Sequence, residues 1–336
     1  MQAVYSLGAV GAVIVAAALA GQVMGGNAWM SAVAYAGFAV FLAGFCYRVV
    51  QWAAAPVPFR IPTTCGQQKS LPWIKSAALE NPSTTGGVLG RMALEILLFR
   101  SLFRNSQARL YQGRAIFTEQ KYLWLAALAF HWSLLIILVR HLLLLVEPVP
   151  AALLLIERVD GFFQLGVPPL YLSDIVFACA LAYLLLRRFQ DAVVRYISQF
   201  SDYFALLVLI GIAASGMLMR YVTRVDVVGV KQFALGLAAF HPLRPAALGS
   251  VFAVHLALIS VLAAYFPFSK LMHTGGVFLS PTRNLANNNR ATRHINPWNY
   301  PVKTHRYAEW EEEFRDKLKG ADLPLEADHA TRASAD

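Results

Sequence analysis

The first 47 residues contain no charged side chain, and this stretch most constrains how the chain can fold. One transmembrane helix needs about 20 apolar residues, so the stretch is long enough for two. Gly25, Gly26 and Asn27 give a turn signal that divides it. The whole chain of 336 residues is 57% hydrophobic and only 14% charged. This composition excludes an ordinary soluble globule and predicts an integral membrane protein.

Hydropathy in a window of roughly 19 residues predicts an all-α membrane protein with six transmembrane helices. The first span could be a cleaved signal peptide, but no positive segment precedes it, so we expect it to be retained. We expect three parts, namely an extra N-terminal helix (1–27), a core (28–275) and a C-terminal tail (276–336). The six candidate spans lie near 4–24, 28–50, 121–146, 169–187, 201–220 and 248–268.

The charges of the connections predict that both termini are on the cytoplasmic side of a prokaryotic membrane, because positive loops are retained there. Connection 51–120 carries eight Lys and Arg residues against three acidic ones, whereas 147–168 carries more acidic than basic residues. Connection 220–247 opposes this assignment, since it is basic on the predicted external side. Positive loops beside anionic headgroups account for the net charge of +10 without any nucleic-acid partner.

Connection 51–120 contains a second predicted element. Residues 91–111 place apolar residues and arginines at helical spacing, which predicts an amphipathic helix at the membrane interface. Such a helix either docks a cytoplasmic partner or simply lies on the lipid. After residue 268 the chain is basic through residue 306 and then mixed and acidic. We expect about the last ten residues to be disordered.

Four histidines are the most informative residues, because ionisable side chains inside a membrane are costly and usually functional. His131 and His141 lie in the third span, His255 lies in the sixth, and His273 follows the end of the sixth. Histidines at two depths on two helices could form two bis-imidazole metal sites. Zinc is a weaker alternative, because no carboxylate or cysteine accompanies either pair. The three cysteines form no C-x-x-C motif, which leaves a cysteine-bound cluster or c-type haem unsupported.

Helix geometry predicts how these histidines pair. Ten residues of α-helix rise about 15 Å, and eighteen rise about 27 Å and return to the same face. The third and sixth spans are antiparallel, so His131 should lie at the cytoplasmic level with His273. His141 should lie at the external level with His255, and each pair could hold one haem iron. We also expect Pro267 to bend or end the helix before His273.

These spacings resemble those of the gamma subunit of respiratory nitrate reductase, a membrane dihaem cytochrome b that oxidises quinol; the resemblance covers 28–273. The run FPFSKLMHTGGVFLSPTRNLANNNR at 266–290 more closely resembles the DsrM family, the cytochrome b subunits of DsrMKJOP complexes associated with dissimilatory sulfite reductase. The resemblance implies a five-helix dihaem core with an extra N-terminal helix. It also implies two haem b groups, the inner held by His131 and His273 and the outer by His141 and His255.

The resemblance further implies an oxidoreductase subunit that exchanges electrons between a quinone, menaquinone or ubiquinone, and a cytoplasmic iron–sulfur partner. That partner would be the heterodisulfide-reductase-like subunit DsrK, within a complex of further subunits that serves sulfite reduction or sulfur oxidation. The direction of electron flow stays open. We expect the partner to dock on 270–306 and on the 51–120 connection.

In the family the quinone site lies beside the outer haem, but the lysine expected there in the nitrate reductase subunit has no clear counterpart. Quinol oxidation releases two protons, so the site needs hydrogen-bonding and protonatable groups. Arg140 could instead pair with a haem propionate or reach the headgroups, Asp174 could only cap its helix, and His241 could be surface loop. The candidates near the outer level are Arg140, Asp160, Asp174, Arg220 and His241.

Two other functions stay open. A transporter or haem-free scaffold could use the histidines as a proton relay, although the sequence shows no inverted repeat. The chain could also be the quinol-oxidising cytochrome b of another reductase, such as nitrate reductase. Visible absorption separates the haem proteins from a transporter.

Overall fold

The computed structural model describes residues 1–23, 28–55, 66–163, 168–242, 248–288, 290 and 304–326. The chain divides into two compact units. The first unit comprises residues 1–55 and 60–292, and the second comprises 56–59 and 293–336. The division between the units at residue 293 lies within the predicted tail, 276–336. About the last ten residues, which the sequence predicts to be disordered, lie outside the described residues.

Among the described residues, five helices are long and apolar enough to cross a membrane, which confirms five of the six predicted spans. Two of them are the helices α1 (Gln2–Val23) and α2 (Ala28–Ala54). The other three each combine an α-helix with a short helix that follows it. They are Lys121–Leu144, formed by α5 (Lys121–His141) and η1 (Leu142–Leu144); Phe200–Thr223, formed by α9 (Phe200–Met217) and η2 (Leu218–Thr223); and Gly249–Phe268, formed by α11 (Gly249–Tyr265) and η3 (Phe266–Phe268). The chain is thus a multi-pass membrane protein.

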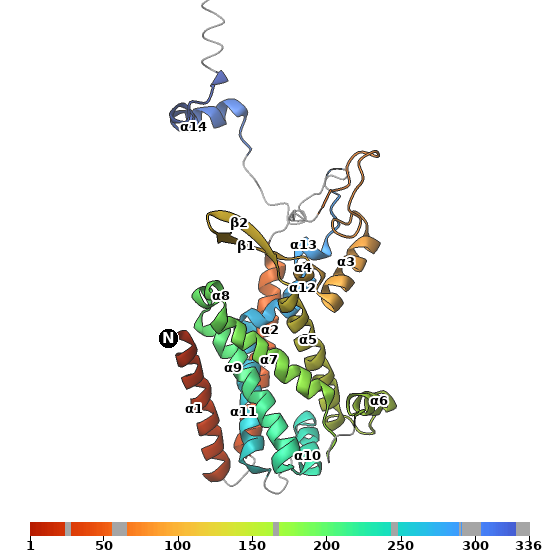
Figure 1. The fold of residues 1–336 in the computed structure, drawn as a ribbon. Helices are drawn as coiled ribbons and strands as arrows, with labels where there is room; N and C mark the ends of the chain where they lie inside the picture. Colours follow the sequence, from red (N-terminus) through yellow and green to blue (C-terminus); the bar gives the residue numbers. More distant parts are fainter. Residues whose placement is uncertain are drawn as a thin grey trace, which may run out of the picture. The chain divides into compact units, whose positions relative to one another are not determined.

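The remaining predicted span corresponds to α7 (Leu172–Gln190), which packs against α5 and α9 within the bundle. This helix carries Asp174 in its first turn and Arg187 and Arg188 in its last turn. These three charges set α7 apart from the five apolar helices. Its crossing of the membrane stays a prediction, supported by its place between two of the apolar helices (Figure 1).

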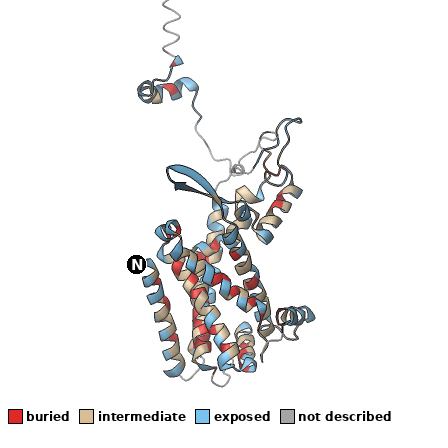
Figure 2. Ribbon diagram, in the orientation of Figure 1, coloured by how far each residue is buried: buried red, intermediate tan, exposed pale blue. Residues whose placement is uncertain are grey.

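The exposed surface of the bundle is apolar. Large side chains such as Leu7, Phe38 and Leu125 are more than half exposed. Figure 2 shows buried residues mainly where helices face one another and exposed residues along the outer faces of the bundle. Exposed apolar surface on this scale is unfavourable in water and suits contact with lipid. The helical backbone satisfies its own hydrogen bonds, as a lipid environment requires.

Two glycines of α2 allow it to lie directly against α11. A Cβ atom added at Gly37 would lie 2.8 Å from the carbonyl oxygen of Ser260, and one at Gly44 would lie 2.7 Å from Cβ of Pro267. Small residues let membrane helices approach closely and gain van der Waals contact. The close contacts of α2 with α11 at Gly37 and with η3 at Gly44 therefore depend on the absence of side chains at these two positions.

We expect the Gly37→Ala substitution to destabilise the protein by about 1–3 kcal/mol, because α2 must move away from the Ser260 backbone. Gly8→Ala is the matched control, since a Cβ at Gly8 meets nothing within 4 Å. That control should be neutral or stabilising by up to about 1 kcal/mol through helix propensity. Thermal unfolding of both variants in one detergent measures the difference. Equal stability of the two variants would contradict the close contact.

The predicted amphipathic helix over 91–111 is wrong beyond Leu98. The structure has α3 (Thr85–Leu98), the short α4 (Arg100–Phe103), and an antiparallel hairpin of β1 (Ser106–Tyr111) and β2 (Arg114–Glu119). Phe99 ends α3 in the left-handed region, with φ 49°. Gln112 and Gly113, with φ 48° and 75°, form the two-residue turn that joins the strands. The turn and the alternation along 106–111 are the signals that the helical interpretation missed.

The two ends of the bundle carry different elements (Figure 1). One end carries the hairpin, α3, α8 (Ala192–Ile197), α12 (His273–Leu279) and α13 (Pro281–Asn284), whereas α6 (Ala151–Asp160) and α10 (Val227–Ala238) lie at the other end. We call these the hairpin end and the α6 end. The second unit contains α14 (Tyr307–Gly320).

The segment that follows α11 runs back along the hairpin end. Helix α11 ends at Tyr265, as predicted from Pro267, and η3 and η4 (Lys270–Met272) lead to His273. Beyond α13, the backbone N–H of Asn287 donates to the carbonyl of Pro82 at 2.7 Å. The Asn287 side chain also donates to Oδ1 of Asn81. These bonds fasten the end of the first unit to the connection that precedes α3.

Candidate functional site

The structure brings His131 and His273 together at the hairpin end of the bundle. Their ring centroids lie 6.0 Å apart and their planes are inclined by 84°. His131 lies within α5, and His273 begins α12 after the break at Pro267. Two imidazoles bound to opposite sides of one metal ion, at about 2.0–2.1 Å each, have centroids roughly 6 Å apart. The separation therefore suits a bis-imidazole site.

His141 and His255 form the second pair, toward the α6 end. His141 is the last residue of α5, and His255 is 8% exposed on α11. The two imidazoles are close enough to affect each other electrostatically. One histidine of each predicted pair lies on α5, and its partner lies on α11 or on α12, which follows α11. The role of these residues as haem ligands stays a prediction.

All four histidines have Nδ1 bound to an oxygen. For three of them the acceptor is a backbone carbonyl: Ala127 for His131 (2.8 Å), Ile137 for His141 (2.7 Å) and Lys270 for His273 (2.8 Å). A carbonyl cannot donate, so hydrogen bonding assigns the proton to Nδ1 and leaves the lone pair on Nε2. Metal-binding histidines are usually oriented by this kind of bond from the second ring nitrogen.

His255 reaches the same tautomer through Ser215 on α9. The Ser215 hydroxyl lies 2.9 Å from Nδ1 of His255 and donates its own proton to the carbonyl of Gly211 at 2.7 Å. Its oxygen is thus available to accept from Nδ1. Gly216 lies beside the same ring, since an added Cβ would come within 3.2 Å of Cε1 of His255. Ser215 is a site residue that the sequence analysis missed, because its partner is 40 positions away.

The donor set fits a haem. Among the described residues, no group of three or more His, Cys, Asp or Glu side chains could hold a metal ion. Two histidines per site suit a metal whose remaining ligands come from a cofactor, as the porphyrin of a b-type haem does. Phe99 and Phe130 both pack edge-on against His131, with centroids at 4.9 Å. Aromatic side chains of this kind shield a haem from water and lower the local polarity.

A cluster of buried charges adjoins His141 at the α6 end. Arg140 lies between two carboxylates: its Nη2 donates to Oδ1 of Asp174 at 2.5 Å, and its Nε lies 2.9 Å from Oδ2 of Asp160. The three side chains are only 10%, 13% and 5% exposed. The Nε contact is close but misaligned for a hydrogen bond. Ser173 completes the cluster by donating backbone N–H and hydroxyl to Asp160.

Tyr171 joins this cluster to Arg220. The guanidinium carbons of Arg140 and Arg220 lie 3.6 and 3.9 Å from the Tyr171 ring centroid. One face of a phenol ring has no room for two guanidinium groups at these distances, so the arginines occupy opposite faces. The Tyr171 hydroxyl donates to Glu157, and Tyr221 donates to Asp174, both at 2.7 Å. We call Arg140, Glu157, Asp160, Tyr171, Ser173, Asp174, Arg220 and Tyr221 the outer cluster.

The structure thus unites four of the five predicted quinone-site candidates, namely Arg140, Asp160, Asp174 and Arg220. It does not bring in His241, which is exposed in the loop after α10 and whose backbone N–H donates to Gly236. Asp174 does more than cap α7, since it binds both Arg140 and Tyr221.

Lys231 is a further residue that the sequence analysis overlooked. It lies on the otherwise apolar α10, which packs against η1 directly after His141. Its ammonium forms an ion pair with Glu147. The signal was available, because a lysine within VVGVKQFALGLA is the single charge in an apolar run. Lys231 therefore adds a cation on a helix that packs against the segment following His141.

Comparison with known proteins identifies the family of the chain. The sequence model that describes the nitrate reductase gamma subunit matches residues 88–294. The chain belongs to the nitrate reductase gamma subunit family. The matched range includes α5, α7, α9 and α11 and all four paired histidines. The family match therefore covers both histidine pairs and the outer cluster, whereas α1 and α2 precede it.

Two relatives of this family member cover most of its length. The chain is 44% identical over 273 residues to the Hdr-like menaquinol oxidoreductase cytochrome b-like subunit of Archaeoglobus fulgidus, which is 79% of this chain and 82% of the relative. It is 40% identical over 274 residues to the protein of the same name from Archaeoglobus profundus, with 80% and 81% covered. The similarity to a membrane cytochrome b of the gamma subunit family, expected from the histidine spacing, is confirmed.

Proposed function

We propose that the chain is a dihaem, quinol-linked cytochrome b that exchanges electrons between the membrane and a cytoplasmic iron–sulfur partner. The observation that carries this proposal is the pair of bis-histidine sites, in which all four Nδ1 atoms are bound and all four Nε2 atoms are left as ligands. The names of both relatives, as cytochrome b-like subunits of menaquinol oxidoreductases, support a quinol as substrate.

In this proposal His131 and His273 hold the inner haem, and His141 and His255 hold the outer one. Bound haems would supply one-electron transfer between the two ends of the bundle. The chain itself fixes the ligands at two depths, because ten residues separate the two histidines of α5, a rise of about 15 Å. Ser215 and the three carbonyls hold each imidazole in the ligating tautomer.

We place the quinol beside the outer cluster and Lys231. Oxidation of one quinol releases two electrons and two protons, so its hydroxyls need acceptors and a route to water. Tyr221 and Asp174 form a hydrogen-bonded pair that can pass a proton onward. Glu147 forms an ion pair with Lys231, and its side chain is 62% exposed, so it offers a second route for protons to water. Menaquinol is the favoured substrate, because both relatives are named for it.

The partner would dock at the hairpin end, beside the inner histidine pair. Both faces of the hairpin are exposed there, including Leu110 and Phe117, which are 80% and 73% exposed. Parts of the predicted surfaces 51–120 and 270–306 contact each other within the first unit, since Arg283 forms an ion pair with Glu95. The partner expected from the resemblance is a heterodisulfide-reductase-like iron–sulfur subunit of the DsrK type, linked to dissimilatory sulfur metabolism. This end would face the cytoplasm, as the positive loops predict.

The test is a reduced-minus-oxidised visible spectrum of the purified chain, with haem quantified as the pyridine haemochrome. We expect about two b-type haems per chain, one per histidine pair. Addition of menaquinol should then reduce the haems. A folded chain made with haem available and found to lack it would contradict the proposal and favour a transporter or scaffold with a histidine proton relay.

Ser215 gives a more selective prediction. Replacing Ser215 by alanine removes the acceptor for Nδ1 of His255, and loss of such a bond weakens metal binding by about 10–100-fold. We expect faster loss of the outer haem to apomyoglobin, with the inner haem unchanged. Ser133→Ala is the matched control, because Ser133 is also buried on a membrane helix and donates to the carbonyl four residues earlier. Equal haem loss in the two variants would contradict the role of Ser215.

A further inference from the structure

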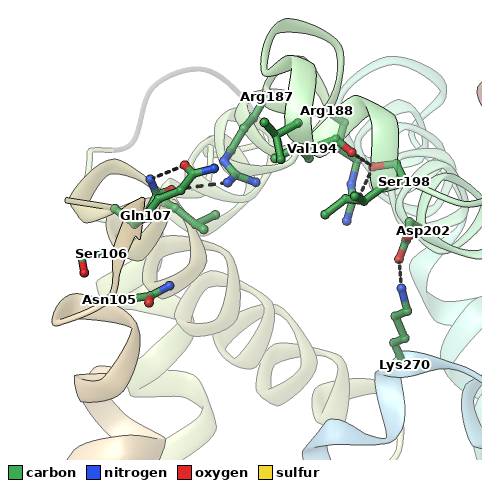
Figure 3. Close-up of a pocket in the computed structure, with 13 residues that line it drawn as sticks. Asn105, Ser106, Gln107, Arg187, Arg188, Val194, Ser198, Asp202 and Lys270 are labelled. Carbon is green, nitrogen blue, oxygen red and sulfur yellow. Dashed lines mark hydrogen bonds and ion pairs between the residues drawn. The ribbon is translucent and has the colours of Figure 1, made fainter. Parts of the chain in front are cut away.

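A pocket of about 430 Å³ opens at the hairpin end, and it extends to Lys270, whose carbonyl binds Nδ1 of His273. It lies where α5 and α9 begin and α7 ends, under α8, and β1 and η4 complete its wall (Figure 3). The proposed electron transfer gives this pocket no role. The lining residues are Asn105, Ser106, Gln107, Gln120, Leu123, Arg187, Arg188, Val193, Val194, Ile197, Ser198, Asp202 and Lys270.

The pocket is electropositive. Its lining holds three cations, Arg187, Arg188 and Lys270, and one carboxylate, Asp202. Asp202 is already engaged by Lys270, whose Nζ lies 2.8 Å from Oδ1 of Asp202. Neither arginine forms an ion pair within the part of the chain that the structure describes. The lining therefore carries a net charge of about +2, which attracts an anion.

Neutral oxygens hold the two arginines in place. Arg188 donates from Nη1 to the hydroxyl of Ser198 at 2.9 Å, and Arg187 donates from Nη2 to Oε1 of Gln120 at 3.4 Å. Figure 3 shows Arg188 bonded to Ser198 at the α7 and α8 side of the pocket, Arg187 extending toward Gln107, and the ion pair between Lys270 and Asp202 apart from both. Each planar guanidinium retains further N–H donors, a geometry that matches the oxygens of a phosphate.

The rim of the pocket is apolar and belongs to the outer surface of the bundle. Val193 and Ile197 line the pocket and are 52% and 65% exposed. Phe189 and Tyr196, on either side of Val193 in the sequence, are exposed too. Helix α8 thus presents apolar side chains beside a cationic pocket at the ends of α5, α7 and α9. A free phosphate would need only the cations, whereas a lipid would use the apolar rim as well.

We propose that this pocket binds the phosphate of an anionic glycerophospholipid. The headgroup phosphate would accept hydrogen bonds from Arg187 and Arg188, and the acyl chains would lie against Val193, Ile197 and the neighbouring outer surface. Basic pockets between membrane helices bind acidic lipid headgroups in this way. The bound lipid would join α7, α8 and α9 to the base of the hairpin, which is the end proposed for partner docking.

The test uses the haem-loaded chain in nanodiscs of phosphatidylglycerol and phosphatidylcholine, released into detergent for native mass spectrometry. We expect phosphatidylglycerol to be retained in preference to phosphatidylcholine. Each lysine or arginine near an anionic headgroup contributes roughly a factor of five in binding. Arg187→Gln with Arg188→Gln should therefore weaken phosphatidylglycerol retention by about 25-fold. Lys75→Gln with Arg114→Gln, at two exposed cations of the same unit, is the matched control and should change little.

Three results would overturn the proposal. The first is equal retention of phosphatidylglycerol and phosphatidylcholine by the unmodified protein. Inorganic phosphate could displace phosphatidylglycerol as readily as added lipid does, which would make the site one for a free anion. The arginine variant could lose the inner haem together with the lipid, which would assign the arginines to the haem propionates. Two haems retained with the lipid lost would support the lipid site independently of quinol oxidation.

Discussion

Replacement of His141 by alanine is expected to remove the outer haem and quinol oxidation while leaving the inner haem in place. His141 is at the end of α5, and its Nδ1 is held by the carbonyl of Ile137, so the variant loses a ligand without loss of a buried helix contact. A haem held by one remaining imidazole is no longer a low-spin bis-histidine group. The haem content should fall from about two to about one per chain, as the pyridine haemochrome measures.

The inner pair supplies the converse variant. His131→Ala should remove the inner haem and leave the outer haem reducible by quinol, while electrons no longer reach an acceptor at the hairpin end. His241→Ala is the control, because His241 is exposed in a loop and should leave both haems unchanged. Loss of both haems in equal measure from the His141 and His131 variants would contradict the pairing by depth, or show that assembly requires both sites together.

The histidine pairs could be predicted because their geometry depends on distances along single helices. The spacing of ten residues in α5 gives the separation of two levels, and the antiparallel direction of α11 gives the partner at each level. Pro267 marks the break that leads to His273, and the structure ends α11 two residues earlier. Helical periodicity and one proline are thus enough to predict which histidines pair, without any information on long-range contacts.

The groups that orient the histidines could be predicted only in part. Three acceptors are carbonyls three or four residues from the histidine, so they follow from the local helix. Ser215 and the Tyr171 ring reach their partners across the bundle, over 40 and 31 positions. The side-chain rotamers and helix rotations that bring such groups together are set by packing, which periodicity does not specify.

The hairpin shows the opposite failure, in which a local signal was present and was misinterpreted. Arginines interleaved with apolar residues over 91–111 match a helical period, but α3 (Thr85–Leu98) overlaps this segment only over 91–98. Beyond Phe99 the alternation of 106–111 and the turn at Gln112 and Gly113 compete with that period and determine the structure. The predicted segment therefore included the end of one helix and the whole first strand of the hairpin.

Arg140→Met is expected to be among the most damaging substitutions in the protein. Arg140 neutralises Asp160 and Asp174 in the outer cluster, where all three side chains are nearly buried. Removing one partner from a buried ion pair costs about 3–5 kcal/mol, because the remaining charge is left uncompensated. Here two carboxylates would remain. We expect thermal unfolding at a clearly lower temperature and loss of quinol oxidation.

A second substitution distinguishes the loss of the Arg140 charge from the loss of its packing. Adding Asp174→Asn to Arg140→Met removes one of the uncompensated carboxylates, so part of the lost stability should return. Arg140→Lys should be intermediate, since an ammonium can neither bridge two carboxylates as a planar fork nor stack on Tyr171 as a guanidinium does. Arg158→Met is the control, because Arg158 is an exposed arginine on neighbouring α6. A double variant no more stable than Arg140→Met would show that Arg140 acts by packing on Tyr171 rather than by its charge.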